Sequence, residues 1–206
     1  MSQFRYVLFG AGRQGTAAIH DLVLNCDAKS VHVVEPDAAR LKAAEARLAS
    51  ILKKRAKVLT YATKATVADL RGAHGVLSCA THHANVELTR MSIEAGVPFT
   101  DLGGNYETVS KQEALAKKSS VPIVPDCGIS PGISNIVAAH CAKVHGCDEV
   151  HVRCGGLPLE RPSAVANPLQ YKLVFSPWGL LSEYSGDVSR IRGGKVSINL
   201  RLQIFP

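Results

Sequence analysis

The six residues Gly10-Ala11-Gly12-Arg13-Gln14-Gly15 have the spacing of a phosphate-binding glycine turn. An apolar run over 4–9 precedes them and an apolar stretch over 16–24 follows, so the turn lies between a predicted strand and a predicted helix. In this context the first glycine allows a tight turn, the second lets a pyrophosphate approach the backbone, and the third lets the helix pack on the strand. The free N–H groups at the helix start face the phosphates. The motif predicts a dinucleotide site; a glycine-rich turn without a ligand is the alternative.

Glu35 follows a second apolar run, 31–34, about twenty residues after the glycines, where a carboxylate accepts hydrogen bonds from the adenosine ribose. A carboxylate there repels a 2′-phosphate, which favours NAD. Arg13 and Arg40 can counter that repulsion, so NADP remains possible. Asp37, at the start of the next predicted helix, is included among the candidate cofactor-binding residues.

Two later loops combine glycines with polar side chains at the ends of predicted strands. The segment 125–132 carries two prolines and two glycines and opens a helix, whose N-terminus can receive a substrate carboxylate or the nicotinamide amide. A rigid turn without a ligand role is the alternative. In the segment 101–105, Gly103 and Gly104 permit close approach, and Asn105 offers both a donor and an acceptor.

Tyr171 and Lys172 are neighbours on a predicted strand, so their side chains point to opposite faces. One of them faces the interior or a cleft. With a shifted pKa, either side chain can handle the proton that accompanies hydride transfer from an amine. A purely structural role for each is the alternative.

The elements that position these residues alternate between strand and helix with short connections, which predicts an α/β fold: a Rossmann-type doubly wound parallel sheet followed by the start of a second α/β domain. We expect a nucleotide-binding domain over 1–146 and a partial substrate and dimerisation domain over 147–206. In such a sheet the ligand lies at the carboxyl ends of the strands. The predicted strands are 4–9, 31–35, 57–61, 75–80, 98–101, 121–124, 148–154, 169–175 and 195–204, and the predicted helices are 14–25, 37–54, 66–71, 84–95, 107–119, 132–145 and 178–184.

Composition narrows the classes of function. The chain has 206 residues, 46% of them hydrophobic, and a net charge of +7. Without an apolar run long enough to span a membrane, or a signal peptide, we expect a cytoplasmic protein with no membrane partner. The basic cluster at 53–57 has no interleaved aromatic residue, which argues against nucleic-acid binding. The six cysteines lack metal-ligand spacing, so no metal is expected.

Four motifs in order resemble the saccharopine dehydrogenase family, which includes saccharopine reductases and lysine 6-dehydrogenases. They are the glycine turn, Asp101-Leu-Gly-Gly-Asn, Pro125-Asp-Cys-Gly-Ile-Ser-Pro-Gly and Cys154-Gly-Gly-Leu-Pro. The resemblance implies a Rossmann domain followed by an α/β substrate and dimerisation domain. It also implies NAD(P)-dependent oxidation at a C–N bond of a small amino acid, in a homodimer.

The resemblance also assigns roles by position. Cofactor binding falls to the glycine turn and Glu35, with Cys79, Ala80 and Thr81 along the cofactor toward the nicotinamide. Gly103, Gly104, Asn105, Asp126 and Cys127 would line the hydride-transfer site, so Asp126 and Cys127 join Tyr171 and Lys172 as catalytic candidates. Family enzymes are generally longer, so we expect an unfinished second domain. A non-catalytic NAD(P)-binding or sensing module, or an inactive fragment, remains the alternative.

Overall fold

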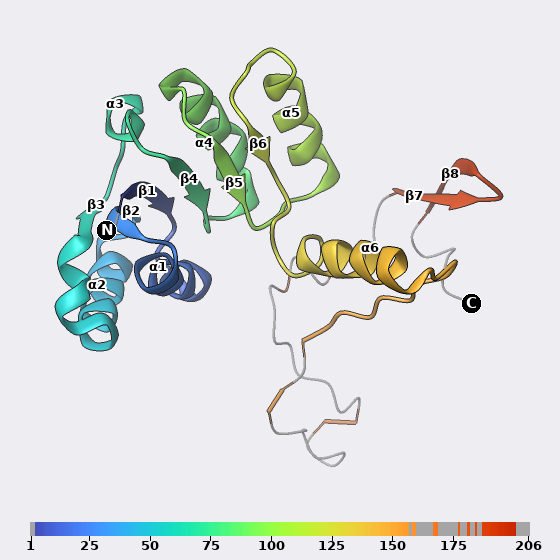
Figure 1. Ribbon diagram of the computed structural model, residues 1–206, viewed down its shortest axis with the longest axis horizontal. Coiled ribbons are helices and arrows are strands. Elements are labelled where there is room, and N and C mark those ends of the chain that lie inside the picture. Colours follow the sequence, from blue (N-terminus) through green and yellow to red (C-terminus); the bar gives the residue numbers. More distant parts are fainter. Residues whose placement is uncertain are drawn as a thin grey trace. The chain divides into compact units, whose positions relative to one another are not determined.

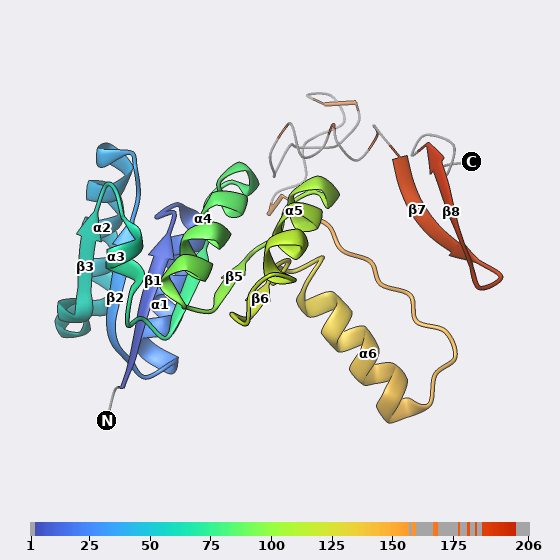
Figure 2. The ribbon, with the colours of Figure 1, turned by 90° about the horizontal axis from the view of Figure 1, so that it is seen from above.

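The structure is a computed structural model. Within the residues that it describes, six strands form one parallel sheet. These residues are 3–156, 158–159, 167–168, 177, 181, 184 and 187–200. The strand order is β3-β2-β1-β4-β5-β6, so the chain reverses its direction of winding between β1 and β4. Figure 2 shows the succession from β3 through β2 and β1 to β5 and β6. The predicted doubly wound fold is confirmed. The strands are β1 (Phe4–Phe9), β2 (Ala28–Val34), β3 (Leu59–Ala62), β4 (Gly75–Ser78), β5 (Phe99–Asp101) and β6 (Ile123–Val124).

Helices cover both faces of this sheet, as Figure 1 shows for α1 and α2 on one side and α3 and α4 on the other. Two apolar clusters result. Leu8 packs with residues of α1 and α2, whereas Val7 and Phe9 pack with Leu70 of α3 and Leu88 of α4. The side chains of successive β1 residues therefore pack into the two cores on opposite faces of the sheet, because side chains alternate across a strand. The helices are α1 (Arg13–Asn25), α2 (Ala38–Leu52), α3 (Val67–Leu70), α4 (His82–Ala95), α5 (Tyr106–Ala116) and α6 (Ile133–His145), with a 3-10 segment η1 (Lys53–Val58).

Local sequence explains where several helices begin and end. Asp37 caps α2 by accepting hydrogen bonds from the N–H groups of Ala39 and Arg40, at 2.9 and 3.0 Å. Asn105 caps α5 through the N–H of Thr108 at 2.9 Å. α4 ends at Gly96 with a φ of +72°, a left-handed conformation that glycine adopts without steric cost. Each of these helix ends is thus fixed by a capping residue of the local sequence.

The chain divides into two compact units, Met1–Val152 and Arg153–Pro206. In the second unit β7 (Asp187–Arg192) and β8 (Lys195–Leu200) form an antiparallel hairpin closed by Gly193 and Gly194, both with positive φ. The strand predicted over 148–154 is wrong: these residues lie in no strand and are exposed, and none of the described strands pairs with them. The division at residue 146 stays a prediction. No helix in the described segments is long and apolar enough to cross a membrane.

Candidate functional site

The glycine turn joins β1 to α1, and its three glycines meet different surroundings. A Cβ built on Gly10, whose φ is +91°, would lie 2.7 Å from the backbone nitrogen of Ala80. A Cβ on Gly15 would overlap the carbonyl oxygen of Gly10, so the helix packs directly against the turn. A Cβ on Gly12, in contrast, would have no described atom within 4 Å. The turn is therefore closed on the protein side and open at Gly12, which fits a pyrophosphate lying against the backbone.

The start of α1 has the electrostatics of an anion site. An α-helix leaves its first N–H groups without intrahelical partners and carries a partial positive charge there. In the described part of the chain, no side chain caps this end, and the first turn holds no acidic residue. Arg13 and Gln14 occupy the first two helical positions. These features suit the phosphates of a dinucleotide.

Glu35 directly follows β2 and links two loops of this site. Its side chain is only 8% exposed. Oε2 accepts a hydrogen bond from the N–H of Ala11 at 3.0 Å, and Oε1 accepts one from the N–H of Asp37 at 3.1 Å. Each carboxylate oxygen retains a free lone pair for a ribose hydroxyl. Glu35 therefore holds the glycine turn against the β2–α2 loop and leaves acceptor capacity for the adenosine ribose.

Replacing Glu35 should destabilise the protein even without a ligand. Glu35→Ala removes the acceptor of two backbone N–H groups, and we expect the free energy of unfolding to fall by about 2–4 kcal/mol. Glu35→Gln should cost about half as much, because one oxygen remains. Urea unfolding of the cofactor-free chain measures both, with Glu94→Ala on the exposed surface of α4 as the control. A loss for Glu35→Ala no larger than that of the control would refute the linking role.

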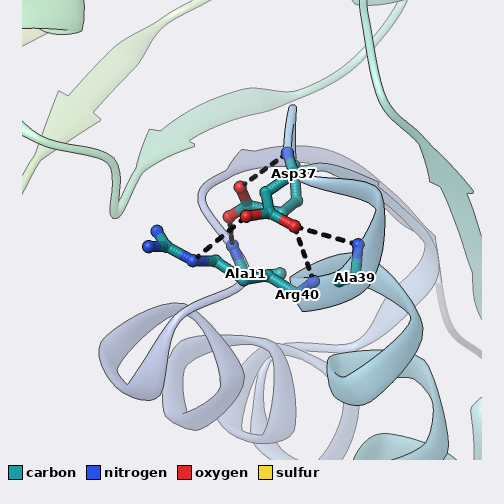
Figure 3. Close-up of polar contacts among 5 residues, drawn as sticks. Ala11, Asp37, Ala39 and Arg40 are labelled. Carbon is teal, nitrogen blue, oxygen red and sulfur yellow. Dashed lines mark hydrogen bonds and ion pairs between the residues drawn. The ribbon is translucent and has the colours of Figure 1, made fainter.

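The N–H of Asp37 donates to Oε1 of Glu35, which places the two residues side by side. The Asp37 carboxylate interacts with the start of α2 (Figure 3). Besides capping the helix, it forms an ion pair with the Arg40 guanidinium at 3.5 Å. The backbone hydrogen bond from Arg40 is the main reason that the pKa of Asp37 is lowered. The structure thus gives this candidate cofactor-binding side chain a structural role at the rim of the site.

A cavity of about 180 Å³ opens where the glycine turn meets α2. Its walls combine small side chains with three guanidinium groups, two of them from α2. The lining residues are Ala11, Gly12, Arg13, Arg40, Ala43, Ala44 and Arg47.

Asp101, the last residue of β5, organises the loops at the other end of the site. It is fully buried. Its Oδ1 accepts hydrogen bonds from the N–H groups of Gly103 and Asp126, at 2.9 and 3.0 Å. Its Oδ2 accepts one from Nε2 of Gln112 at 2.7 Å. One carboxylate therefore ties together the loops that follow β5 and β6.

The polar network continues beneath these loops. Nε2 of Gln112 also donates to Oγ1 of Thr89 at 3.0 Å, and that hydroxyl donates to the carbonyl oxygen of Asn85 at 2.7 Å. Oδ1 of Asn85 accepts from the Ser78 hydroxyl at 2.7 Å. Oε1 of Gln112 is buried without a hydrogen-bond partner in the described residues. The ends of β4 and β5 thus rest on buried hydrogen bonds.

Asp126 follows β6 and has a left-handed backbone, with a φ of +62°. Its Oδ1 accepts a hydrogen bond from the N–H of Gly104 at 3.1 Å. Burial raises the pKa of Asp126; the Gly104 hydrogen bond partly lowers it, and the charge of Asp101 raises it again. The carboxyl group therefore keeps its proton to a higher pH than an exposed aspartate.

The structure brings Asp126 together with the other residues expected near hydride transfer. Cys127 is exposed, and its N–H donates to the carbonyl oxygen of Asp101 at 2.8 Å. A Cβ on Gly103 would lie 3.3 Å from Oδ1 of Asp126, so glycine keeps this approach open. Oδ1 of Asn105 serves as the cap of α5. The two glycine-containing loops thus form one wall of the site.

Cys79, Ala80 and Thr81 connect β4 to α4 and lie next to the glycine turn. The N–H of Cys79 donates to the carbonyl oxygen of Phe9 at 2.7 Å, which extends the pairing of β1 and β4. Burial raises the pKa of the Cys79 thiol to about 11, so it is protonated at neutral pH. Thr81 is the N-cap residue of α4. Cys79 therefore acts as a packing residue beside the glycines, and the backbone of this segment borders the site.

Two catalytic candidates, Tyr171 and Lys172, lie outside the described residues, as do the strand predicted over 169–175 and most of the helix predicted over 178–184. The assignment of the two residues stays a prediction.

Three residues of the site were missed by sequence reasoning: the side chains of Asp101 and Gln112, and Arg47. Asp101 carried a usable signal, since an acidic residue ending an apolar strand and preceding two glycines is expected to bond loop N–H groups. Gln112 and Arg47 carried none, because a polar residue on a helix is usually exposed.

The strand order, the glycine turn and the carboxylate at the end of β2 define a dinucleotide-binding domain of the Rossmann type. A family model described as the saccharopine dehydrogenase NADP binding domain matches residues 6–124, and one described as the saccharopine dehydrogenase C-terminal domain matches residues 128–201. The chain therefore belongs to the saccharopine dehydrogenase family.

Solved structures with the same fold include enzymes of several activities. The apo, histidine-tagged saccharopine dehydrogenase (L-Glu forming) from Saccharomyces cerevisiae has a TM-score of 0.63 at 20% identity, over 95% of this chain and 44% of its own. Myo-inositol 2-dehydrogenase from Lactobacillus plantarum has a TM-score of 0.53 at 18% identity, over 71% and 43%. A myo-inositol dehydrogenase from Corynebacterium glutamicum has a TM-score of 0.52 at 20% identity, over 70% and 41%. The chain thus spans less than half the length of each.

The family and fold are those of nicotinamide-cofactor-dependent dehydrogenases. The description of the matched nucleotide-binding domain names NADP as the nucleotide. The preference for NAD inferred from Glu35 stays a prediction.

Proposed function

We propose that this chain is an NAD(P)-dependent oxidoreductase that acts on the C–N bond of a small amino acid, in the manner of saccharopine or lysine 6-dehydrogenases. The observation that carries the proposal is the open backbone at Gly12 beside an uncapped helix start and the carboxylate of Glu35. The family supports the reaction class.

Residues at one end of the site would bind the adenosine half of the cofactor, and residues at the other end would act on the substrate. The turn from Gly10 to Gly15 holds the pyrophosphate, and Glu35 accepts a hydrogen bond from the adenosine ribose. NAD(P)⁺, when bound, would supply the acceptor for the hydride that leaves the carbon bearing the amine. The substrate nitrogen loses a proton in the same oxidation, and the resulting imine is hydrolysed by water or cyclises.

Asp126 is the described side chain best suited to receive that proton. It lies at the carboxyl end of the sheet, half-buried, and the Gly104 N–H fixes one of its oxygens at 3.1 Å. Its raised pKa brings the carboxyl group nearer to the range useful for acid–base catalysis. Tyr171 and Lys172 are the competing proposals for this role.

The Asp126 assignment predicts a change in turnover without a change in cofactor binding. Asp126→Asn keeps the oxygen that accepts from Gly104 but cannot take a proton. We expect kcat to fall by about 10²- to 10⁴-fold and the acidic limb of the kcat/KM pH profile to disappear. An unchanged pH profile would exclude Asp126 as the proton acceptor.

The test of function as a whole is turnover with lysine or saccharopine, measured beside the affinity for NADH and NADPH by nicotinamide fluorescence. Binding with turnover supports the enzyme and begins to name its substrate. Binding without turnover favours the alternative, a module that binds or senses NAD(P). Binding of neither nucleotide would overturn the dinucleotide site itself.

The expected homodimer is likewise a proposal that rests on the family resemblance. Sedimentation velocity at several protein concentrations tests it, and a monomer at all concentrations would contradict it.

A further inference from the structure

Gln112 of α5 is buried, and the two ends of its amide group differ in their hydrogen bonding. Nε2 donates to Oδ2 of Asp101 at 2.7 Å and to Oγ1 of Thr89 at 3.0 Å. Oε1 is buried and accepts no hydrogen bond from a described residue. The side chain thus supplies a donor to Asp101 and leaves its own acceptor without a partner.

This arrangement lowers the stability that the position could have. A buried carbonyl oxygen without a partner has lost its hydrogen bonds to water and gained none in return. An unbranched apolar side chain of similar size, methionine, would fill the same space without that loss. Methionine cannot donate to Asp101, however. The advantage of glutamine at this position therefore lies in its donor, and departures from complete hydrogen bonding tend to occur at functional sites.

Asp101 connects Gln112 to the loop that follows β6. Its other oxygen, Oδ1, accepts hydrogen bonds from the N–H groups of Gly103 and Asp126, at 2.9 and 3.0 Å. The three groups that bond its side chain are all donors, which suits an ionised carboxylate. Burial is the main cause of the raised pKa of Asp126, and the charge of Asp101 adds to it. A change at Gln112 can therefore reach Asp126 through Asp101.

The other titratable groups around Asp126 belong to adjoining segments. Cys127 follows it and is exposed. His82, at the start of α4, packs against the loop between β5 and α5. Burial lowers the pKa of His82 and the charge of His83 lowers it further, so this imidazole is mostly neutral at neutral pH. Among the described residues, Asp101 is thus the carboxylate whose charge acts on Asp126.

We propose that Gln112 is a positioning residue for the reaction: through Asp101 it fixes the loop that carries Asp126 and maintains a negative charge beside it. The inference rests on the proposed function, in which Asp126 receives the proton of the substrate amine. The hydrogen bond from Gln112 holds one oxygen of Asp101, so that the other oxygen stays directed at the N–H groups of Gly103 and Asp126.

Gln112→Met tests the inference, because it keeps the approximate size of the side chain and removes its donor. Oδ2 of Asp101 is then a buried oxygen without a donor, which favours the protonated form of that carboxyl group. The negative charge beside Asp126 decreases, so the pKa of Asp126 should fall. A pH titration of the Asp126 carboxyl carbon by ¹³C NMR, assigned with Asp126→Asn, measures this shift in the chain without substrate.

Turnover gives the second measurement. Gln112→Met should lower kcat by about tenfold to a hundredfold, because a small displacement of the proton acceptor slows the reaction. The acidic limb of the kcat/KM profile should move to lower pH, together with the titration of Asp126. The affinities for NADH and NADPH should stay unchanged, since the glycine turn lies at the other end of the site.

Gln112→Glu is the conservative variant, and it carries the test if Gln112→Met does not fold. While the new carboxyl group is protonated it can donate to Asp101, as the amide does, and kcat should remain close to that of the wild type. Once it ionises, the donor is lost and two carboxylates repel each other. Activity should then fall at a pH at which the wild type is still active. A wild-type pH profile in this variant would contradict the role of the donor.

Ser92→Ala is the matched control, because Oγ of Ser92 is also buried without a described hydrogen-bond partner, and no hydrogen bond joins it to Asp101. It should leave the Asp126 titration and the pH profile unchanged. An unchanged Asp126 titration in Gln112→Met would overturn the inference, and so would an equal shift in Ser92→Ala. The expected shift in a chain whose wild type does not turn over lysine or saccharopine would overturn the proposed function alone.

Discussion

Gly12→Val is expected to weaken NADPH and NADH binding by about a hundredfold or more, which corresponds to about 3 kcal/mol, and to leave the fold almost unchanged. The backbone of Gly12, with a φ of −69° and a ψ of −163°, is extended, so a valine there does not require a left-handed conformation. The new side chain meets no described atom within 4 Å of its Cβ and occupies the space of the pyrophosphate. The lost N-cap preference should cost about 1 kcal/mol of folding stability. Nicotinamide fluorescence and urea unfolding measure the two effects separately.

Gly15→Val provides the contrast, because its Cβ overlaps the carbonyl oxygen of Gly10. We expect a loss of at least about 2 kcal/mol in the free energy of unfolding, since the turn and α1 have to separate. Gly12→Val thus tests the placement of the ligand, and Gly15→Val tests the packing of α1 against the turn. Unchanged nucleotide affinity in Gly12→Val would refute the placement of the pyrophosphate.

Asp101→Ala should be the most destabilising single change in the site. It leaves the N–H groups of Gly103 and Asp126 and the amide of Gln112 without their acceptor, inside the protein. We expect the free energy of unfolding to fall by about 3–4 kcal/mol. Urea unfolding measures the loss, and hydrogen exchange at the two backbone N–H groups reports whether the loops open.

Asp101→Asn separates hydrogen bonding from charge. The asparagine Oδ1 can accept from both backbone N–H groups, and its amide nitrogen can donate to Oε1 of Gln112 if that side chain rotates, since Oε1 has no described partner. The expected cost is therefore only about 1 kcal/mol. Asp148→Ala, an exposed acidic residue, is the control. A similar cost for Asp101→Ala and Asp148→Ala would show that Asp101 does not hold the loops.

Apolar runs that alternate with helical segments predicted the sheet, because the central strands of a parallel sheet are buried on both faces and are apolar throughout. The boundaries of β1 match the predicted 4–9, and those of α6 differ from the predicted 132–145 by one residue. The strand prediction over 148–154 was wrong because alternation indicates only that one side of a segment is buried. A strand also requires a neighbouring strand to which its backbone can hydrogen-bond. The β7 strand was not predicted, and its sequence, Asp-Val-Ser-Arg-Ile-Arg, alternates too weakly to stand out.

The residues of the candidate site that act within one short segment could be predicted from the sequence, but the contacts between segments could not. The spacing of three glycines and a carboxylate indicates their roles, so the sequence locates the adenosine end of the site. The hydrogen bond that Gln112 donates to Asp101 and the one that the Gly104 N–H donates to Asp126 join residues 11 and 22 positions apart in different segments. Such contacts follow only from the order of β4, β5 and β6 in the sheet. The same holds for Arg47, whose relation to Arg13 depends on how α2 packs beside α1.

The hydrogen bonds that the N–H groups of Ala11 and Asp37 donate to Glu35 also bear on the kinetics of nucleotide binding. They immobilise two walls of the adenosine site before any ligand arrives. Ordering a loop on binding loses conformational entropy and slows association, whereas a preformed wall does neither. The adenosine half of a dinucleotide should therefore bind first. The nicotinamide half, covalently linked to the bound adenosine half, then binds at the other end of the site.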